Sequence, residues 1–139
     1  MHLIFSTKER QPLINPEIRI DLFAYLGGIV YGMRGSTIII NGTDDHVHML
    51  IRIRPSHSVS EVARVVKTNS SGWAHEKGYK EFAWQAGYGV FSVSESAIPS
   101  VTDYIANQEE HHKTKSFQEE FIAFLKKNNV EYDERYIWS

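Results

Sequence analysis

The 139-residue chain contains no cysteine, which excludes disulfide bonds, zinc–thiolate sites and cysteine nucleophiles. It also has no apolar run as long as a membrane span and no signal peptide, so we expect a cytoplasmic protein with no membrane partner. A formal net charge of −2 gives no overall attraction to nucleic acid. Hydrophobic residues make up 42% of the sequence, which predicts a single globular domain over residues 1–139.

The charges are unevenly distributed along the chain. Residues 1–80 carry ten Lys and Arg against seven Asp and Glu, whereas residues 81–139 carry five against ten. A basic face within the first part of the chain is one interpretation of this difference. An ordinary solvated surface is equally compatible with it.

The most informative stretch is a hairpin pattern over residues 37–53. A β-branched run, Thr37–Ile40, is followed by Asn41-Gly42 and then by Thr-Asp-Asp, which is turn chemistry. In the second strand His46 and His48 point to the same face, about 7 Å apart, while Val47 has the opposite parity and faces a core. Two imidazoles on one face can hold a divalent metal if another protein ligand completes the site. Solvated or hydrogen-bonded histidines on a half-exposed strand are the alternative.

Helices are predicted on both sides of this hairpin. Asn15-Pro16 and the pair Ser58 and Glu61 have capping chemistry, and they begin helices that reach about residues 31 and 77. The polar run Lys67–Ser71 within the second helix indicates either an exposed face or a set of phosphate donors. Strands are predicted over residues 3–5, 82–85 and 90–94, and further helices over 101–112 and 116–128.

This order of elements, βαββαβ, is typical of a split-βαβ (ferredoxin-like) α+β fold. We therefore expect an antiparallel sheet with helices packed on one face, followed by a C-terminal helix that carries Tyr104.

Tyr104 and Gln108 are a candidate second half for the histidine site. Residues four apart on a helix lie one above the other, about 6 Å apart along the axis. A phenol can act as a nucleophile, and an amide oxygen can bind a hard metal ion. The alternative is that Tyr104 packs and Gln108 lies on the surface. His111 and His112 are competing ligands, although adjacent helical residues point about 100° apart and cannot both face one site.

Four ordered blocks resemble a known family, the single-tyrosine HUH transposases of small insertion sequences, which includes relatives associated with repeated extragenic palindromes. The blocks are residues 2–8 (HLIFSTK), 45–50 (DHVHML), 84–94 (WQAGYGVFSVS) and 101–112 (VTDYIANQEEHH). The resemblance therefore extends over nearly the whole chain.

The resemblance implies a strand transferase that cleaves and rejoins single-stranded, hairpin-bearing DNA through a 5′-phosphotyrosine intermediate. It implies Tyr104 as the nucleophile, Mg²⁺ or Mn²⁺ held by His46, His48 and Gln108, and no nucleotide cofactor. It also implies a homodimer, and it favours a tyrosine helix that completes the partner's histidine site. The candidate phosphate contacts of such an enzyme are Lys8, Arg10, Arg52, Arg54 and Lys67.

Two other functions account for part of the pattern. A non-catalytic or domesticated hairpin-binding protein would stack single-stranded bases on aromatic side chains, for which Trp84, Tyr88 and Phe91 are the candidates. A metal-dependent nuclease would use water as the nucleophile, and Tyr104 would only pack. A covalent protein–DNA adduct distinguishes the transposase from both.

Overall fold

The structure is a computed structural model that describes residues 1–108 and 116–127. Four strands form one sheet: β1 (His2–Ser6), β2 (Ser36–Gly42), β3 (His46–Arg52) and β4 (Gly89–Phe91). Two short 3₁₀ turns are η1 (Lys8–Arg10) and η2 (Glu95–Ala97). The described helices are α1 (Pro16–Gly32), α2 (Val59–Glu76), α3 (Ile98–Ala106) and α5 (Phe117–Lys127). Among these helices, none is both long and apolar enough to span a bilayer.

The strands are ordered β2-β3-β1-β4, and every neighbouring pair is antiparallel. This order confirms the predicted split-βαβ fold. α1 connects β1 to β2, which have β3 between them, and α2 connects β3 to β4, which have β1 between them. The register sets Ile4 opposite His48 and Ser6 opposite His46. The two histidines therefore lie in the middle of the sheet, between β2 and β1.

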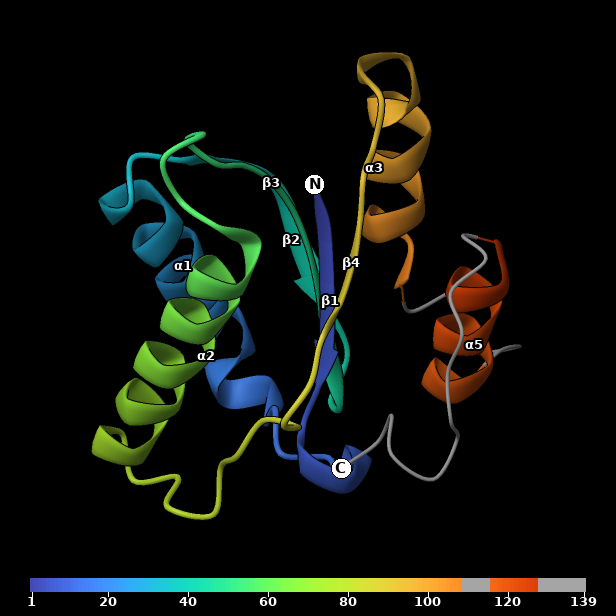
Figure 1. Cartoon of the computed structure of the whole chain (residues 1–139). Coiled ribbons are helices and arrows are strands. Elements are labelled where there is room, and N and C mark those ends of the chain that lie inside the picture. The colour runs from blue at the N-terminus through green and yellow to red at the C-terminus, as the bar shows by residue number, and fades with distance from the viewer. Residues whose placement is uncertain (109–115, 128–139) are drawn as a thin grey trace.

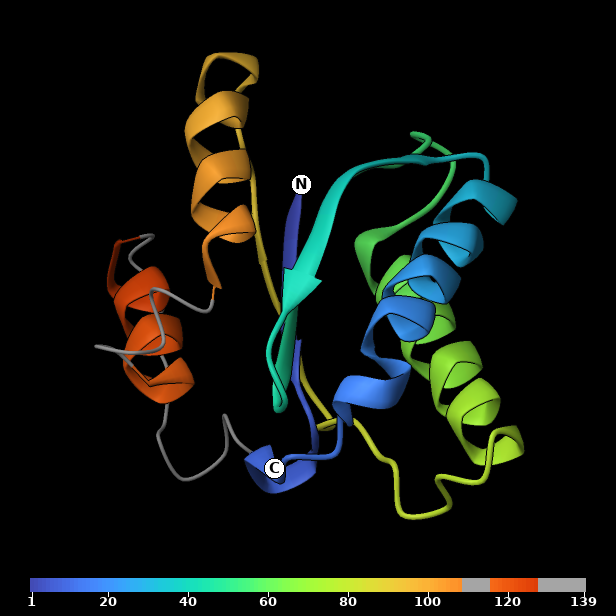
Figure 2. The same cartoon turned by 180° about the vertical axis from the view of Figure 1, so that it is seen from behind.

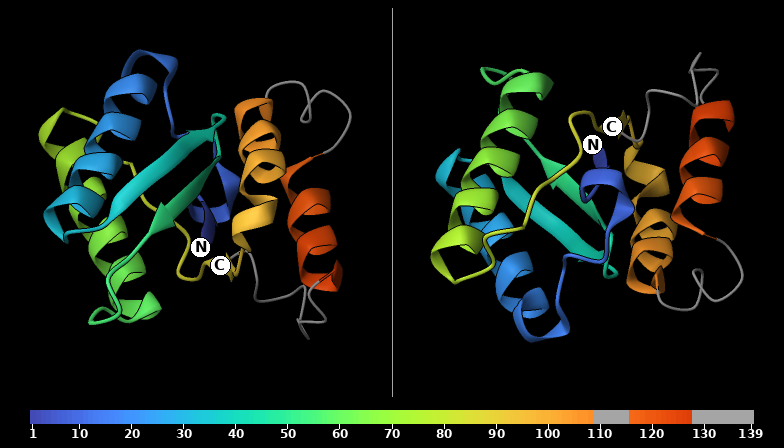
Figure 3. Two further views of the ribbon diagram at one scale, coloured as in Figure 1. Left: turned by 90° about the horizontal axis from the view of Figure 1, so that it is seen from above. Right: turned by 90° about the horizontal axis from the view of Figure 1, so that it is seen from below.

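Helices cover both faces of the sheet (Figures 1 and 2). α1 and α2 pack on one face, and the views from above and below show α3 and α5 side by side on the other (Figure 3). The larger core lies under α1 and α2. It contains Leu3, Phe5, Val47, Met49 and Ile51 from the sheet, Leu22, Leu26 and Val30 from α1, and Val62, Ala63 and Val66 from α2.

The predicted starts of α1 and α2 are confirmed, whereas α3 starts at Ile98, earlier than predicted. The Asn15 side chain accepts a hydrogen bond from the Glu17 amide at 2.9 Å, and Pro16 occupies the first helical position, where its missing N–H is tolerated. The Ser58 hydroxyl accepts from the Glu61 amide at 3.1 Å. α3, in contrast, ends at Ala106 rather than continuing to His112, because Asn107 leaves helical geometry at φ −102° and ψ 31°. His111 and His112 lie outside the described residues.

The turn of the hairpin differs from the prediction. Asn41 and Gly42 are still paired with β3, opposite His48 and Val47, and the connection is formed by residues 43–45. Glycine is required here by close packing, since a Cβ on Gly42 would lie 2.2 Å from the His46 carbonyl oxygen. Asn41 uses its side chain to hold α3, as described below.

The strand predicted over residues 82–85 is wrong, and the strand predicted over 90–94 is shorter and earlier. Trp84 instead forms a single antiparallel bridge with Thr7, made by backbone hydrogen bonds from Lys8 to Ala83 and from Gln85 to Ser6, both at 2.9 Å. The Gln85 side chain adds to this pairing by accepting from the Ser6 amide at 2.6 Å. Trp84 in turn donates its indole N–H to the Ser70 hydroxyl at 2.9 Å. Ser70 is therefore a buried structural residue of α2, which corrects its interpretation as an exposed residue or a phosphate donor.

Candidate functional site between the sheet and two helices

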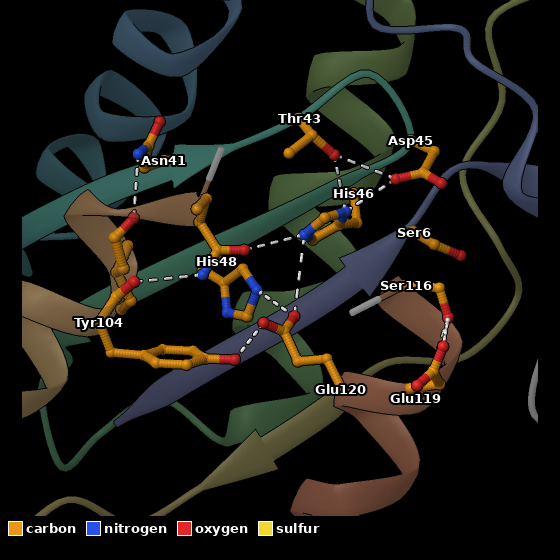
Figure 4. Close-up of polar contacts among 12 residues, drawn as sticks. Ser6, Asn41, Thr43, Asp45, His46, His48, Tyr104, Ser116, Glu119 and Glu120 are labelled. Carbon is orange, nitrogen blue, oxygen red and sulfur yellow. Dashed lines mark hydrogen bonds and ion pairs between the residues drawn. The ribbon is translucent and has the colours of Figure 1, made fainter. Parts of the chain in front are cut away.

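The histidine pair lies on the sheet face that α3 and α5 cover (Figure 4). Strand alternation sends His46 and His48 to this face and Val47 to the opposite core, as predicted. Both imidazoles have an exposed fraction of 0%, which differs from the half-exposed strand considered in the sequence analysis. Their ring centroids are 5.2 Å apart and the rings are nearly perpendicular, at 78°. A buried polar pair of this kind has to be satisfied by neighbouring polar groups.

His46 is oriented by the loop that precedes it. Its Nδ1 lies 2.8 Å from a carboxylate oxygen of Asp45 and 2.9 Å from the Thr43 hydroxyl. A carboxylate only accepts hydrogen bonds, so in the neutral ring Nδ1 carries the proton and Nε2 presents its lone pair to the site. Nε2 lies 3.0 Å from Oε1 of Gln108, whose amide nitrogen donates to the Tyr104 carbonyl at 3.3 Å. With the His46 proton on Nδ1, two acceptor atoms, His46 Nε2 and Gln108 Oε1, face each other; in a protonated ring Nε2 would instead donate to Gln108.

This convergence of acceptors suits a divalent cation. Two ligands about 2.1 Å from an octahedral ion and at right angles to each other are separated by about 3 Å, which is the observed separation of His46 Nε2 and Gln108 Oε1. A second group of ligand atoms, from His46, His48 and Glu120, lies within 4.8 Å of one another. Amide and carboxylate oxygens suit Mg²⁺ and Mn²⁺, whereas imidazole nitrogens suit divalent transition ions, so the mixed set is compatible with Mn²⁺. The residues present thus fit the metal that the sequence resemblance implies.

His48 is held between two other side chains. Its Nδ1 lies 2.8 Å from Nε2 of His2, and its Nε2 lies 2.8 Å from Oε1 of Glu120. Burial, with a smaller effect of the neighbouring His48, lowers the pKa of His2 to about 3, so His2 is neutral at physiological pH. If Glu120 is ionised, Nε2 of His48 donates to it and Nδ1 accepts from His2.

Tyr104 faces the histidines from α3. Its ring centroid is 6.1 Å from that of His48, and its hydroxyl donates a short hydrogen bond to Oε2 of Glu120. Burial raises the pKa of the Tyr104 phenol, and the hydrogen bond to Glu120 and the charge of that carboxylate raise it further. The phenol is therefore fully protonated in this arrangement.

α3 docks on its own chain. The Asn41 side-chain amide donates to the carbonyls of Ile105 and Ala106, at 2.9 and 3.2 Å, and so joins β2 to the end of the tyrosine helix. The sequence resemblance favoured docking on a partner subunit instead. In this structure the single chain brings Tyr104 and Gln108 to its own histidine pair.

Glu120 is the residue of this site that the sequence analysis missed. It lies on α5 between Phe117, Phe121 and Phe124, which form the apolar side of that helix, and its exposed fraction is only 1%. Glu120 comes three residues after Phe117 and four before Phe124, so it shares their helical face. An acidic residue at such a position is the signal that could have identified it. The predicted start of this helix is confirmed by the Ser116 hydroxyl, which accepts from the Glu119 amide at 3.2 Å.

The predicted phosphate contacts do not gather on one surface. Lys8 and Arg10 follow β1 at one end of the sheet, whereas Arg52 and Arg54 lie at the opposite end, beyond the pairing of β3 with β1. Arg52 pairs with Glu95 at 2.8 Å. Lys67 belongs to α2 and donates to the carbonyls of residues 86 and 87 at 3.1 and 2.9 Å.

The aromatic side chains considered for base stacking are also engaged. Trp84 and Phe91 are buried, and Phe91 stacks on Phe124 with centroids 5.3 Å apart. Tyr88 is partly buried against the larger core. Trp84 and Phe91 therefore stabilise the fold in this structure rather than offering open faces for single-stranded bases.

The comparisons with known proteins agree with the fold. A family profile described as "Transposase IS200 like" matches residues 1–108. A crystal structure of a protein from Deinococcus radiodurans R1, assigned as a transposase, is similar with a TM-score of 0.61 and 24% identity, over 77% of this chain and 88% of that one. The REP-associated tyrosine transposase bound to a REP hairpin is similar with a TM-score of 0.57 and 15% identity, over 76% of this chain and 63% of that one. No curated protein matches the sequence. The profile covers most of the chain, including β1, the histidine strand and the tyrosine helix, and the chain belongs to the IS200-like transposase family.

Proposed function

We propose that the protein is a DNA strand transferase that cleaves and rejoins single-stranded, hairpin-bearing DNA, with Tyr104 as its nucleophile. The observation that carries this proposal is the convergence of a half-buried Tyr104 with the buried Gln108 and histidine pair at one site. Neither a packed tyrosine nor a solvated histidine pair requires such a convergence. The hairpin-bound structural neighbour supports this class of DNA partner.

We assign His46, His48 and Gln108 as the residues that hold Mg²⁺ or Mn²⁺. Such an ion, when bound, neutralises charge on the non-bridging phosphate oxygens and orients the phosphate. Asp45 keeps the proton of His46 on Nδ1, so that Nε2 is available as a ligand. For His48, ligation through Nε2 requires the proton on Nδ1, where it would be donated to His2.

The chemical step conserves the number of phosphodiester bonds. The Tyr104 oxygen forms a bond to phosphorus, the bond from phosphorus to the 3′-oxygen breaks, and its electron pair leaves with that oxygen. The phenol loses one proton and the 3′-oxygen gains one, so the products are a 5′-phosphotyrosine and a 3′-hydroxyl. A second 3′-hydroxyl can reverse the step and join new ends, without a nucleotide cofactor.

The proposed assembly is a homodimer that binds two DNA ends, and the candidate phosphate contacts are Lys8, Arg10, Arg52, Arg54 and Lys67. Since these cations lie at different places on the chain, only some of them can contact one strand. Salt dependence of binding should consequently be modest, with a slope of log affinity against log salt shallower than about −4, at roughly −0.7 per phosphate.

The proposal is tested by covalent capture of DNA. The protein is incubated with Mn²⁺ and a single-stranded hairpin whose flanks are randomised and whose 3′ end is labelled, because a 5′-phosphotyrosine retains the 3′ fragment. We expect a labelled protein band on a denaturing gel with the natural chain and none with Tyr104→Phe, while DNA binding is nearly unchanged. Cleavage without any adduct, at equal rates in both proteins, would instead identify a nuclease in which water attacks. Binding without cleavage would identify a hairpin-binding protein.

A further inference from the structure

One carboxylate connects the two halves of the candidate site. Oε1 of Glu120 lies 2.8 Å from Nε2 of His48 and 3.8 Å from Nε2 of His46. Oε2 accepts the hydrogen bond of the Tyr104 hydroxyl. Figure 4 shows this carboxylate between the phenol and the imidazoles. Because Glu120 and both histidines are buried, its two oxygens fill the space that separates the nucleophile from the metal ligands.

The proposed reaction requires a phosphate in that same space. The phosphorus has to come within about 3–3.5 Å of the attacking phenol oxygen. A non-bridging oxygen of the same phosphate has to face the metal ligands. A carboxylate and a phosphodiester are both anions that present two acceptor oxygens, and two anions in one buried site disfavour each other strongly.

We infer that the Glu120 carboxylate occupies the subsite of the scissile phosphate, so that α5 has to withdraw from this position before a DNA strand can be cleaved. This inference rests on the proposed function. It makes α5 a segment of the chain that competes with the substrate. The structure described here is then the closed form of the enzyme, in which the nucleophile and one metal ligand are both bound to Glu120.

The remaining contacts of α5 suit a helix that is held in place but can be displaced. Its apolar residues Phe117, Phe121 and Leu125 form a small cluster with Ile4 and Phe91, separate from the larger core under α1 and α2. A cleft of about 340 Å³ lies between α3 and α5, and both Tyr104 and Glu120 line it. Removal of α5 would therefore open the site without disturbing the core that holds the sheet to α1 and α2.

Gly89 offers a way to displace α5 without touching a site residue. It belongs to β4, and a Cβ at this position would lie 2.6 Å from Cε2 of Phe121. That ring stacks on Phe117, with centroids 5.6 Å apart, and cannot turn away freely. A Gly89→Ala substitution should therefore push α5 outward and leave Glu120 itself unchanged.

The test compares rates of adduct formation at a DNA concentration below saturation, with the 3′-labelled hairpin and Mn²⁺ described above. Glu120→Ala removes the competing carboxylate, and Gly89→Ala displaces the helix that carries it. We expect each variant to form the adduct at least about tenfold faster than the natural chain. When the closed form predominates, the observed rate is the rate of the open form multiplied by the small fraction of molecules that are open. The matched control is Glu119→Ala, which removes an exposed carboxylate from the same helix and should leave the rate unchanged.

An unchanged or slower rate in both test variants would overturn the inference. A general base or a permanent metal ligand at Glu120 predicts a slower rate for Glu120→Ala, and a ligand also predicts weaker Mn²⁺ binding by calorimetry. The competing carboxylate predicts Mn²⁺ affinity that is equal or higher in the variant. Gly89→Ala keeps the test decisive if Glu120→Ala does not fold.

Hydrogen exchange gives a readout that does not depend on catalysis. The natural chain is saturated with the same hairpin in EDTA, so that no cleavage takes place, and exchange of the α5 amides is measured. We expect their protection to fall at least about tenfold on DNA binding. Unchanged protection in the bound protein, or no binding at all, would overturn the inference. If none of the proteins forms an adduct, the proposed function fails. Hydrogen exchange then still tests whether DNA binding displaces α5.

Discussion

Acid should destabilise the protein through a residue that has no charge at neutral pH. His2 lies in the first strand, is 1% exposed, and bonds through Nε2 to Nδ1 of His48 at 2.8 Å. Burial lowers its pKa from 6.5 to about 3 in the folded chain. Between these two pH values the unfolded chain binds a proton at His2 that the folded chain does not bind. Stability that is present above about pH 6.5 is therefore lost as the pH falls toward 3.

The size of the effect follows from the two pKa values. Between pH 7 and pH 5 the unfolded histidine becomes almost fully protonated, whereas the folded one remains neutral. The free energy of unfolding should then fall by about 2 kcal/mol from His2 alone, at about 1.4 kcal/mol for each full pH unit. This loss is a large part of the stability of a small domain, which is typically about 5–15 kcal/mol.

Urea unfolding at pH 7 and pH 5 measures this contribution. Other histidines titrate as well, so the natural chain is compared with His2→Gln, which keeps an N–H donor near His48 but does not titrate. We expect the variant to lose about 2 kcal/mol less than the natural chain over the same interval. An equal loss in the two proteins would refute a neutral, buried His2. A larger loss in the variant would show that the charge is carried by another group of the network.

Three further outcomes are expected. In calorimetry, His46→Ala should abolish Mn²⁺ binding, whereas Gln108→Ala should weaken it less because water can replace one oxygen ligand of a hard cation; unchanged affinity in both would show that the site is assigned wrongly. Gly28→Ala should raise the free energy of unfolding by about 0.5–1 kcal/mol, since the position is helical and a Cβ there meets nothing within 4 Å; a loss of stability in thermal unfolding would contradict this. A mixture of His48→Ala and Tyr104→Phe chains should form no DNA adduct if the arrangement of this structure, in which Tyr104 lies beside the histidines of its own chain, is the one that acts; an adduct on the His48→Ala chain would instead establish the tyrosine helix as the partner's.

The features predicted correctly from the sequence are those that local chemistry determines. Side chains alternate along a strand, so the positions of His46 and His48 relative to Val47 follow from spacing alone. Caps act within a few residues, and Asn15 and Ser58 therefore marked the starts of α1 and α2. The order of these elements was sufficient for the fold class.

The errors arose where tertiary contacts override a local preference. Asn41-Gly42 has the composition of a two-residue turn, yet Gly42 is needed inside the ladder and Asn41 is needed to bind α3. Trp84 and Gln85 belong to a strand-like run, yet their backbone pairing is limited to one bridge with Thr7, and their side chains bond to Ser70 and Ser6. Neither partner can be identified from neighbouring residues.

Glu120 shows that the sequence can mark a residue of the site without identifying its partners. Its position places a carboxylate on the apolar side of α5, which local preference would exclude, since a buried ionised group has to be paired. Its partners, His48 and Tyr104, are 72 and 16 residues away in sequence, so only the folded chain brings them together. A residue that conflicts with its own helix but is satisfied by two candidate functional side chains is expected at a working site rather than in a passive core. The conflict also limits how firmly α5 can be held, because an apolar residue at position 120 would bind the same surface without desolvating a charge. We therefore expect the role of the Glu120 carboxylate to be exclusion of a phosphate from the site. It is not expected to stabilise the packing of α5.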